Sequence, residues 1–184
     1  MKTLTNEEKR FVDWDNELRF NSMGYSDAQV INLAKMAIEF AYDNFKELED
    51  IYEGYVFKYE GRITDIALGI DSHLQKNKKN TSSTAIKQFV IDIINTEKYG
   101  RGRDGFIFLL YVLKMDDVLS HLATERKNFW GTPRIQFQLL YALFKRKILG
   151  FTKEAEMLIE NHPKETELKK YARKYIDMSM KQVK

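Results

Sequence analysis

The chain has 184 residues, of which 43% are hydrophobic and 31% charged, and its formal net charge is +3. These values are typical of a soluble globular protein of one domain or of two closely joined halves. Cysteine is absent, which excludes a disulfide framework, thiolate catalysis and thiolate metal ligands, and agrees with a reducing compartment.

The longest uninterrupted apolar run, residues 106–113, has eight residues. A membrane-spanning helix needs about 20. Acidic residues also stand near the N-terminus, where a signal peptide would have its apolar segment. We therefore expect no membrane contact, no export signal and a cytoplasmic location.

Charge is unevenly distributed along the chain. Residues 1–60 contain 13 Asp or Glu and 7 Lys or Arg, whereas the remaining 124 contain 14 and 23. Such opposite signs can steer a charged partner or hold two halves together. The alternative is that solvated helices simply differ in composition.

In the first half, apolar residues at helical spacing predict helices over about residues 6–21, from 26 onward, from 62 to 75 and from 84 onward. Gly61 is expected to interrupt the chain, and residues 75–84 read as a polar loop. The caps expected at the helix starts are Thr5 with Glu8, Ser26 with Gln29, and Ser83 or Thr84.

Acidic and aromatic residues of the first 60 positions form the first candidate binding face, because tyrosine and tryptophan are enriched at protein interfaces. Its members are Trp14, Glu47, Glu49, Asp50, Tyr52, Glu53, Tyr55 and Tyr59. The alternative places Trp14 in the core and continues a helix to about residue 59, with half-buried tyrosines and solvated acids.

A second candidate precedes the helix expected from Asp104. Arg101 and Arg103 stand among three glycines just before that helix start, where backbone amides and guanidinium groups together suit an anion or a carboxylate. Neither the dinucleotide fingerprint nor the Walker pattern is present. The alternative is that both arginines pair with acids of adjacent helices.

The second half repeats with an offset of 30 residues, which aligns Tyr111 with Tyr141 and Tyr171. Helices are expected over residues 104–115 and 135–148, after Asp116 or Asp117, after Thr152, and around residues 168–176. A helical-pair repeat buries its apolar faces by stacking on its neighbours. The pattern predicts an all-α protein built as an α-solenoid.

Over residues 84–180, three segments resemble HEAT-like repeats of the short kind found in phycobilisome-lyase-type proteins: YGRGRDGFIFLLYVLK, LLYALF and NHPKETELKKYARKYI. The resemblance implies a right-handed α-solenoid of helical pairs over residues 84–184. Residues 1–83 would form an irregular helical cap, and the two regions one continuous domain. It also implies protein binding more often than catalysis.

No constellation of residues indicates a reaction. The three histidines are far apart in sequence, and the zinc-protease, nucleophile-elbow, kinase and deaminase patterns are absent. Asp116 and Asp117 are adjacent, so on a helix they point about 100° apart and suit a cap better than an acid–base pair. We expect no enzyme, no metal site and no cofactor.

By its size and helical architecture the chain is similar to bacterial immunity proteins, which neutralise contact-dependent or polymorphic toxins by blocking their active sites. The acidic and aromatic group would contact a basic toxin, and Arg101, Arg103 and Trp130 an acidic one. An alternative is nucleic-acid binding, and a third is a neutral assembly adaptor. The phosphate contacts of the nucleic-acid alternative would be Arg101, Arg103, Arg126, Lys127, Arg134, Lys145 and Arg146.

Overall fold

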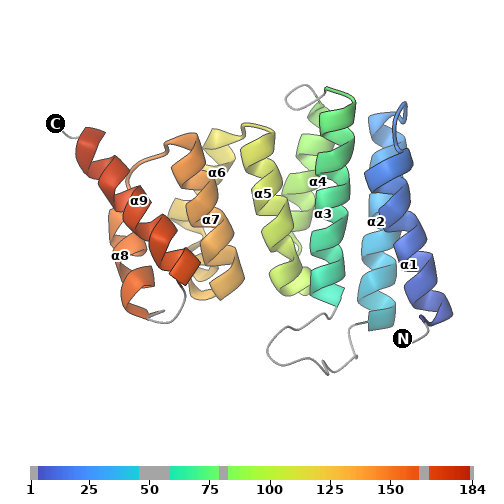
Figure 1. Ribbon diagram of the computed structural model, residues 1–184, viewed down its shortest axis with the longest axis horizontal. Coiled ribbons are helices and arrows are strands. Elements are labelled where there is room, and N and C mark those ends of the chain that lie inside the picture. The colour runs from blue at the N-terminus through green and yellow to red at the C-terminus, as the bar shows by residue number, and fades with distance from the viewer. Residues whose placement is uncertain (1–3, 46–58, 79–82, 162–165, 183–184) are drawn as a thin grey trace. The chain divides into compact units, whose positions relative to one another are not determined.

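The computed structural model describes residues 4–45, 59–78, 83–161 and 166–182, and every regular element within these ranges is helical (Figure 1). The all-α class is therefore confirmed for this part of the chain. The α-helices are α1 (Asn6–Asn16), α2 (Asp27–Phe45), α3 (Tyr59–Lys76), α4 (Thr84–Asn95), α5 (Asp104–Val112), α6 (Asp116–Glu125), α7 (Pro133–Arg146), α8 (Thr152–Asn161) and α9 (Thr166–Gln182). Shorter segments are the π-helical turn η1 (Glu17–Asn21) and the 3-10 helices η2 (Glu97–Arg103) and η3 (Lys127–Gly131).

Internal contacts gather the chain into two compact units, Met1–Leu109 (unit 1) and Leu110–Lys184 (unit 2). The division predicted between residues 83 and 84 rests on the repeat pattern and not on compactness, so it stays a prediction. Within the described ranges, no helix is both long and apolar enough to cross a bilayer.

Local capping signals fix the helix starts of unit 1. Thr5 and Glu8 form the reciprocal pair of bonds of a capping box at α1. Ser26 and Gln29 exchange equivalent bonds before α2. The Ser83 hydroxyl accepts a bond from the third residue of α4. The predicted caps are confirmed because each uses partners only three residues away.

The core of unit 1 lies where α2, α3, η1 and η2 pack together. The sequence predicts an interruption at Gly61, but α3 begins at Tyr59 and contains this buried glycine. Glycine costs a helix only about 1 kcal/mol, which packing of α3 can outweigh. Further along, a Cβ on Gly102 would lie 2.8 Å from the Cβ of Ile63, so this glycine permits close approach of η2 to α3.

In unit 2, α7 lies beside α9, while α6 packs on α7 and α8 packs on α9 (Figure 1). Fully buried apolar side chains from each of these helices fill the space between them. They include Leu119, Ile135, Leu139, Leu140, Leu143, Leu158 and Tyr175. Each helix therefore depends on a neighbour to cover its apolar side.

Helices α5 and α7 end in the same way. Lys114 and Lys147 follow them with φ values of 55° and 58°, and the next residue's N–H bonds to the carbonyl five residues back at 2.9 and 3.0 Å. This is the Schellman arrangement. The equivalent ends are 33 residues apart, whereas the aligned tyrosines are 30 apart. The difference is close to one helical turn, so Tyr111 occupies on α5 the place that Phe144 occupies on α7. The predicted alignment of Tyr111 with Tyr141 is therefore wrong by about one turn.

Candidate partner-binding face

Unit 2 carries a connected group of half-buried aromatic rings, here named the aromatic face: Tyr111, Phe137, Tyr141, Phe144 and Tyr171. The ring centroids of Tyr141 lie 6.0 Å from Tyr111 and 5.2 Å from Tyr171, in edge-to-face geometry. Phe137 and Phe144 lie 5.7 and 6.1 Å from Tyr171. Of the three tyrosines that mark the sequence repeat, Tyr141 is therefore in contact with both of the others.

Helical spacing explains why these rings share one side of unit 2. Phe137, Tyr141 and Phe144 are four and three residues apart, so they follow one another along α7. On α9 the buried stripe includes Ala172 and Tyr175, and Tyr171 lies at its edge. The rings are thus fixed on rigid helices while part of each remains accessible.

Two exposed lysines lie over the tyrosine rings. The Lys145 ammonium is 5.5 Å from the ring centroid of Tyr141, and that of Lys174 is 5.1 Å from Tyr171. Both distances fall within the range of cation–π attraction. The aromatic face consequently presents positive charge together with apolar surface.

The hydroxyl groups of the tyrosines divide into two classes. Several donate to acceptors within the fold: Tyr25 to Glu17, Tyr59 to the Lys98 carbonyl, Tyr99 to Glu39 and Tyr175 to the Ile148 carbonyl. Within the described residues, Tyr141 and Tyr171 make no hydrogen bond through theirs, and neither oxygen is buried without a partner. Those two hydroxyls therefore reach solvent with their donor capacity unused.

An ion pair lies next to the aromatic face. The Arg146 guanidinium donates two bonds to Asp116, at 2.6 and 2.7 Å, and these bonds lower the pKa of that carboxyl. The sequence predicts that Asp116 or Asp117 caps α6, but Met115 precedes the helix and Asp116 is its first residue, engaged by α7.

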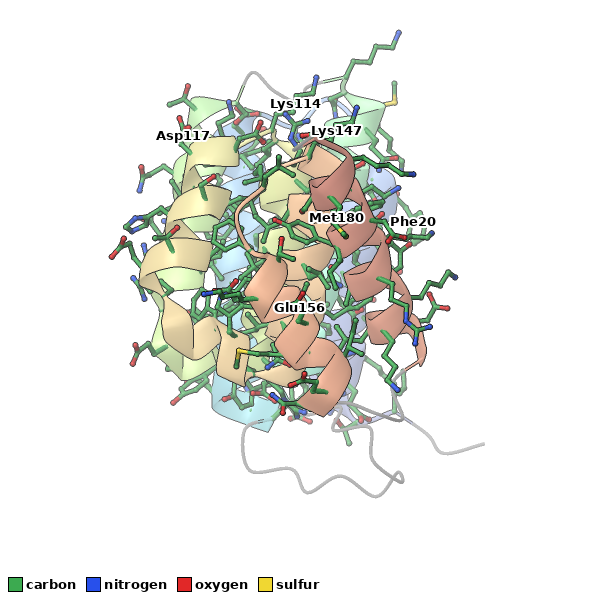
Figure 2. All side chains as sticks on the ribbon, turned by 90° about the vertical axis from the view of Figure 1, so that its left-hand side faces the viewer. Phe20, Lys114, Asp117, Lys147, Glu156 and Met180 are labelled. Atoms are coloured by element: carbon green, nitrogen blue, oxygen red, sulfur yellow. The ribbon has the colours of Figure 1, made fainter. Side chains whose placement is uncertain are left out.

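Lys114 and Lys147 lie at the same end of unit 2 (Figure 2). Residues 110–184 contain 15 Lys or Arg and 9 Asp or Glu, a net charge of +6.

The structure brings Arg101 and Arg103 into contacts within unit 1. Arg101 forms an ion pair with Glu60 at 2.9 Å, and its backbone N–H donates to the same carboxylate. Arg103 is buried and donates to the carbonyls of Gly100 and Ile94. The Arg101 pair agrees with the alternative in which the arginines pair with acids, whereas these two Arg103 bonds go to carbonyls. The role of both arginines toward an anion stays a prediction.

Tyr59, another predicted site residue, lies close to Arg101 in a cluster of tyrosines. Its ring contacts Tyr42 at 5.3 Å, and Tyr42 in turn contacts Tyr99 at 6.2 Å. Burial and, after it, the hydrogen bond to Glu39 raise the pKa of Tyr99. This cluster joins α2, α3 and η2 through bonded hydroxyls.

The two tryptophans are half-buried. Trp14 packs edge-to-face on Phe40 at 5.2 Å, with Arg10 4.7 Å from its ring centroid. In unit 2 the Trp130 indole N–H donates to the Ala123 carbonyl at 3.0 Å. Both rings are thus held by the fold while retaining accessible surface.

The remaining predicted residues lie outside the described ranges and stay predictions: Glu47, Glu49, Asp50, Tyr52, Glu53 and Tyr55. From the sequence, Tyr111, Tyr141 and Tyr171 were interpreted as packing residues of the repeat, and their shared accessible surface was not predicted. Phe137, Phe144 and Lys174 were also missed. The signal available was the repeated placement of a lysine three or four residues after each tyrosine, at 114, 145 and 174.

Comparison with protein-family models, with curated proteins and with solved structures finds no match.

Proposed function

We propose that this chain is a protein-binding helical-repeat scaffold. In this proposal, residues 84–184 are a right-handed α-solenoid of HEAT-like helical pairs, and residues 1–83 are an irregular helical cap. The shared ends of α5 and α7 and the ring contacts from α7 to α9 support it. Stacked helices present a continuous surface, which suits binding better than catalysis.

The aromatic face carries the proposal. Half-buried tyrosines on rigid helices are the residue type that dominates binding energy at interfaces, because they offer a large area at low entropic cost. Tyr141 and Tyr171 also retain hydroxyl donors that the described fold does not use. The partner we propose is a toxin domain in the same cytoplasm. The chain acts without catalysis, as an immunity protein that covers the toxin's active site.

The positive charge of unit 2 keeps nucleic-acid binding as the second candidate. Arg101 and Arg146, two of its expected phosphate contacts, are engaged by Glu60 and Asp116. Breaking those pairs would reduce the gain from binding a phosphate. We therefore place protein binding first.

Co-expression with the product of the reading frame upstream of its own gene tests the proposal. The two proteins are expected to co-purify, with an affinity in the nanomolar range and an association rate that falls with added salt. The chain should also relieve any toxicity of the neighbouring product. Failure to co-purify would refute the immunity function.

A matched set of lysine variants identifies the face. The double variant Lys145→Gln/Lys174→Gln is expected to weaken the complex about tenfold, since it removes two charges from the aromatic face. Lys153→Gln on α8 changes an exposed lysine that contacts none of these rings, so it should bind normally. An equal loss of affinity in the double variant and in Lys153→Gln would exclude the aromatic face as the binding site.

A further inference from the structure

The exposed polar groups of the aromatic face are two hydroxyls, which can donate or accept a hydrogen bond, and two cations, which can only donate. Tyr141 and Tyr171 offer hydroxyl donors, and Lys145 and Lys174 offer ammonium groups above the same rings. A carboxylate accepts several hydrogen bonds and carries the opposite charge. An acidic ligand can therefore accept hydrogen bonds from all four groups and neutralise the two lysines.

The rings are poorly placed for stacking of nucleic-acid bases. Tyr171 is surrounded by the rings of Phe137, Tyr141 and Phe144 and by the Lys174 ammonium. Tyr141 has Phe137 nearly parallel to it, with an interplanar angle of 28°, and Lys145 also close to its ring. Sequence-tolerant binding of single strands needs free ring faces on which bases can stack. This arrangement favours a protein ligand.

The two tyrosine rings are neighbours, so two side chains on one side of a partner helix can approach them together. Their ring centroids are 5.2 Å apart. The Cβ atoms of positions i and i+4 of a helix are about 5–6 Å apart, so the two side chains leave the helix on the same side. Two carboxylates on one side of a partner helix can therefore each approach one tyrosine, while the aliphatic parts of that helix contact the rings.

We propose that the aromatic face recognises an acidic helical segment of a partner protein, with the hydroxyls of Tyr141 and Tyr171 donating to two of its carboxylates. Lys145 and Lys174 provide the complementary charge. The inference rests on the protein-binding role proposed above and adds the chemistry of the partner. It does not require the partner to be a toxin.

Two synthetic probes separate carboxylate recognition from general adhesion. One is a helical peptide of about four turns with leucines and with glutamates at i and i+4. The other has glutamine at those positions. Fluorescence anisotropy is expected to show binding of the glutamate peptide, with the glutamine peptide at least about tenfold weaker, since hydrogen bonds to charged groups are the stronger kind. Equal binding of the two peptides would overturn the inference.

The variant Tyr141→Phe/Tyr171→Phe retains both rings and removes only the hydroxyls. It is expected to melt at the same temperature as the parent chain and to bind the glutamate peptide at least about tenfold more weakly. Tyr25→Phe in unit 1 is the matched control and should bind normally. Unchanged binding by the double variant would show that the hydroxyls are not used.

An oligodeoxythymidylate strand tests the competing ligand class. It should not displace the glutamate peptide, and displacement that is lost in the double variant would assign the face to nucleic acid instead. The two proposals fail separately. If the chain binds the peptide but does not co-purify with the neighbouring product, the immunity function alone is refuted. If Tyr141→Phe/Tyr171→Phe co-purifies with that product as well as the parent chain does, this inference alone is refuted.

Discussion

Replacing Tyr175 by phenylalanine should destabilise unit 2, because this hydroxyl is part of the fold. Tyr175 is 0% exposed on α9. Its hydroxyl donates to the Ile148 carbonyl at 2.7 Å and accepts from the Phe151 N–H at 3.3 Å. It thereby attaches the segment between α7 and α8 to α9. Phenylalanine fills nearly the same volume, so the variant isolates the two hydrogen bonds.

The expected cost follows from what the missing oxygen leaves behind. A carbonyl and an N–H lose their partner, and Ile148 and Phe151 are only partly exposed, so water replaces that partner incompletely. Removing one side of such a bond costs about 1–3 kcal/mol. In a chain of this size, each kcal/mol lowers the melting temperature by about 2–4 °C. A decrease of about 2–12 °C is therefore expected.

Thermal unfolding should be combined with native-state hydrogen exchange, because the two units can unfold separately. The amide of Phe151 is expected to exchange faster in Tyr175→Phe than in the parent chain. Tyr171→Phe, four residues earlier on the same helix, should change stability by less than about 0.5 kcal/mol. If the two variants lost equal stability, the division of tyrosine hydroxyls into bonded and unused groups would be wrong.

Two further predictions concern packing and charge. Gly102→Ala places a Cβ 2.8 Å from that of Ile63 and should cost about 1–3 kcal/mol in chemical denaturation, whereas Gly131→Ala meets nothing within 4 Å and should be nearly neutral. The folded pKa of Asp116 is lowered, so its ion pair stabilises above the ordinary carboxyl pKa and is lost as pH falls through the folded value. Arg146→Met should raise that pKa toward about 3.9 in an NMR titration; no change would contradict the pairing.

Three helix starts of unit 1 were predictable because their capping signal is local. The caps at Thr5, Ser26 and Ser83 use partners within three residues, which a sequence displays directly. The continuous α3 through Gly61 and the pairing of Asp116 with Arg146 were not, because each depends on contacts with a distant helix. Propensity and capping preferences are weak beside such tertiary contacts.

The candidate face shows the same limit more clearly. Periodicity predicts that Tyr141 and Tyr171 lie on neighbouring helices, and their rings do meet. Periodicity does not predict which tyrosine hydroxyl forms a hydrogen bond within the fold. Tyr171 and Tyr175 are the same residue type four positions apart on α9, yet only Tyr175 bonds to the fold. That difference arises from the path of the chain between α7 and α8, which no local pattern encodes.

Hydroxyl-radical footprinting of the chain with its co-expressed partner tests the central claim most directly, since it reports the accessibility of individual side chains. Binding through the aromatic face predicts reduced oxidation of Tyr141 and Tyr171 in the complex, with Tyr25 in unit 1 unchanged. Undiminished oxidation of Tyr141 and Tyr171 alongside protection in unit 1 would contradict it and assign binding to the other unit.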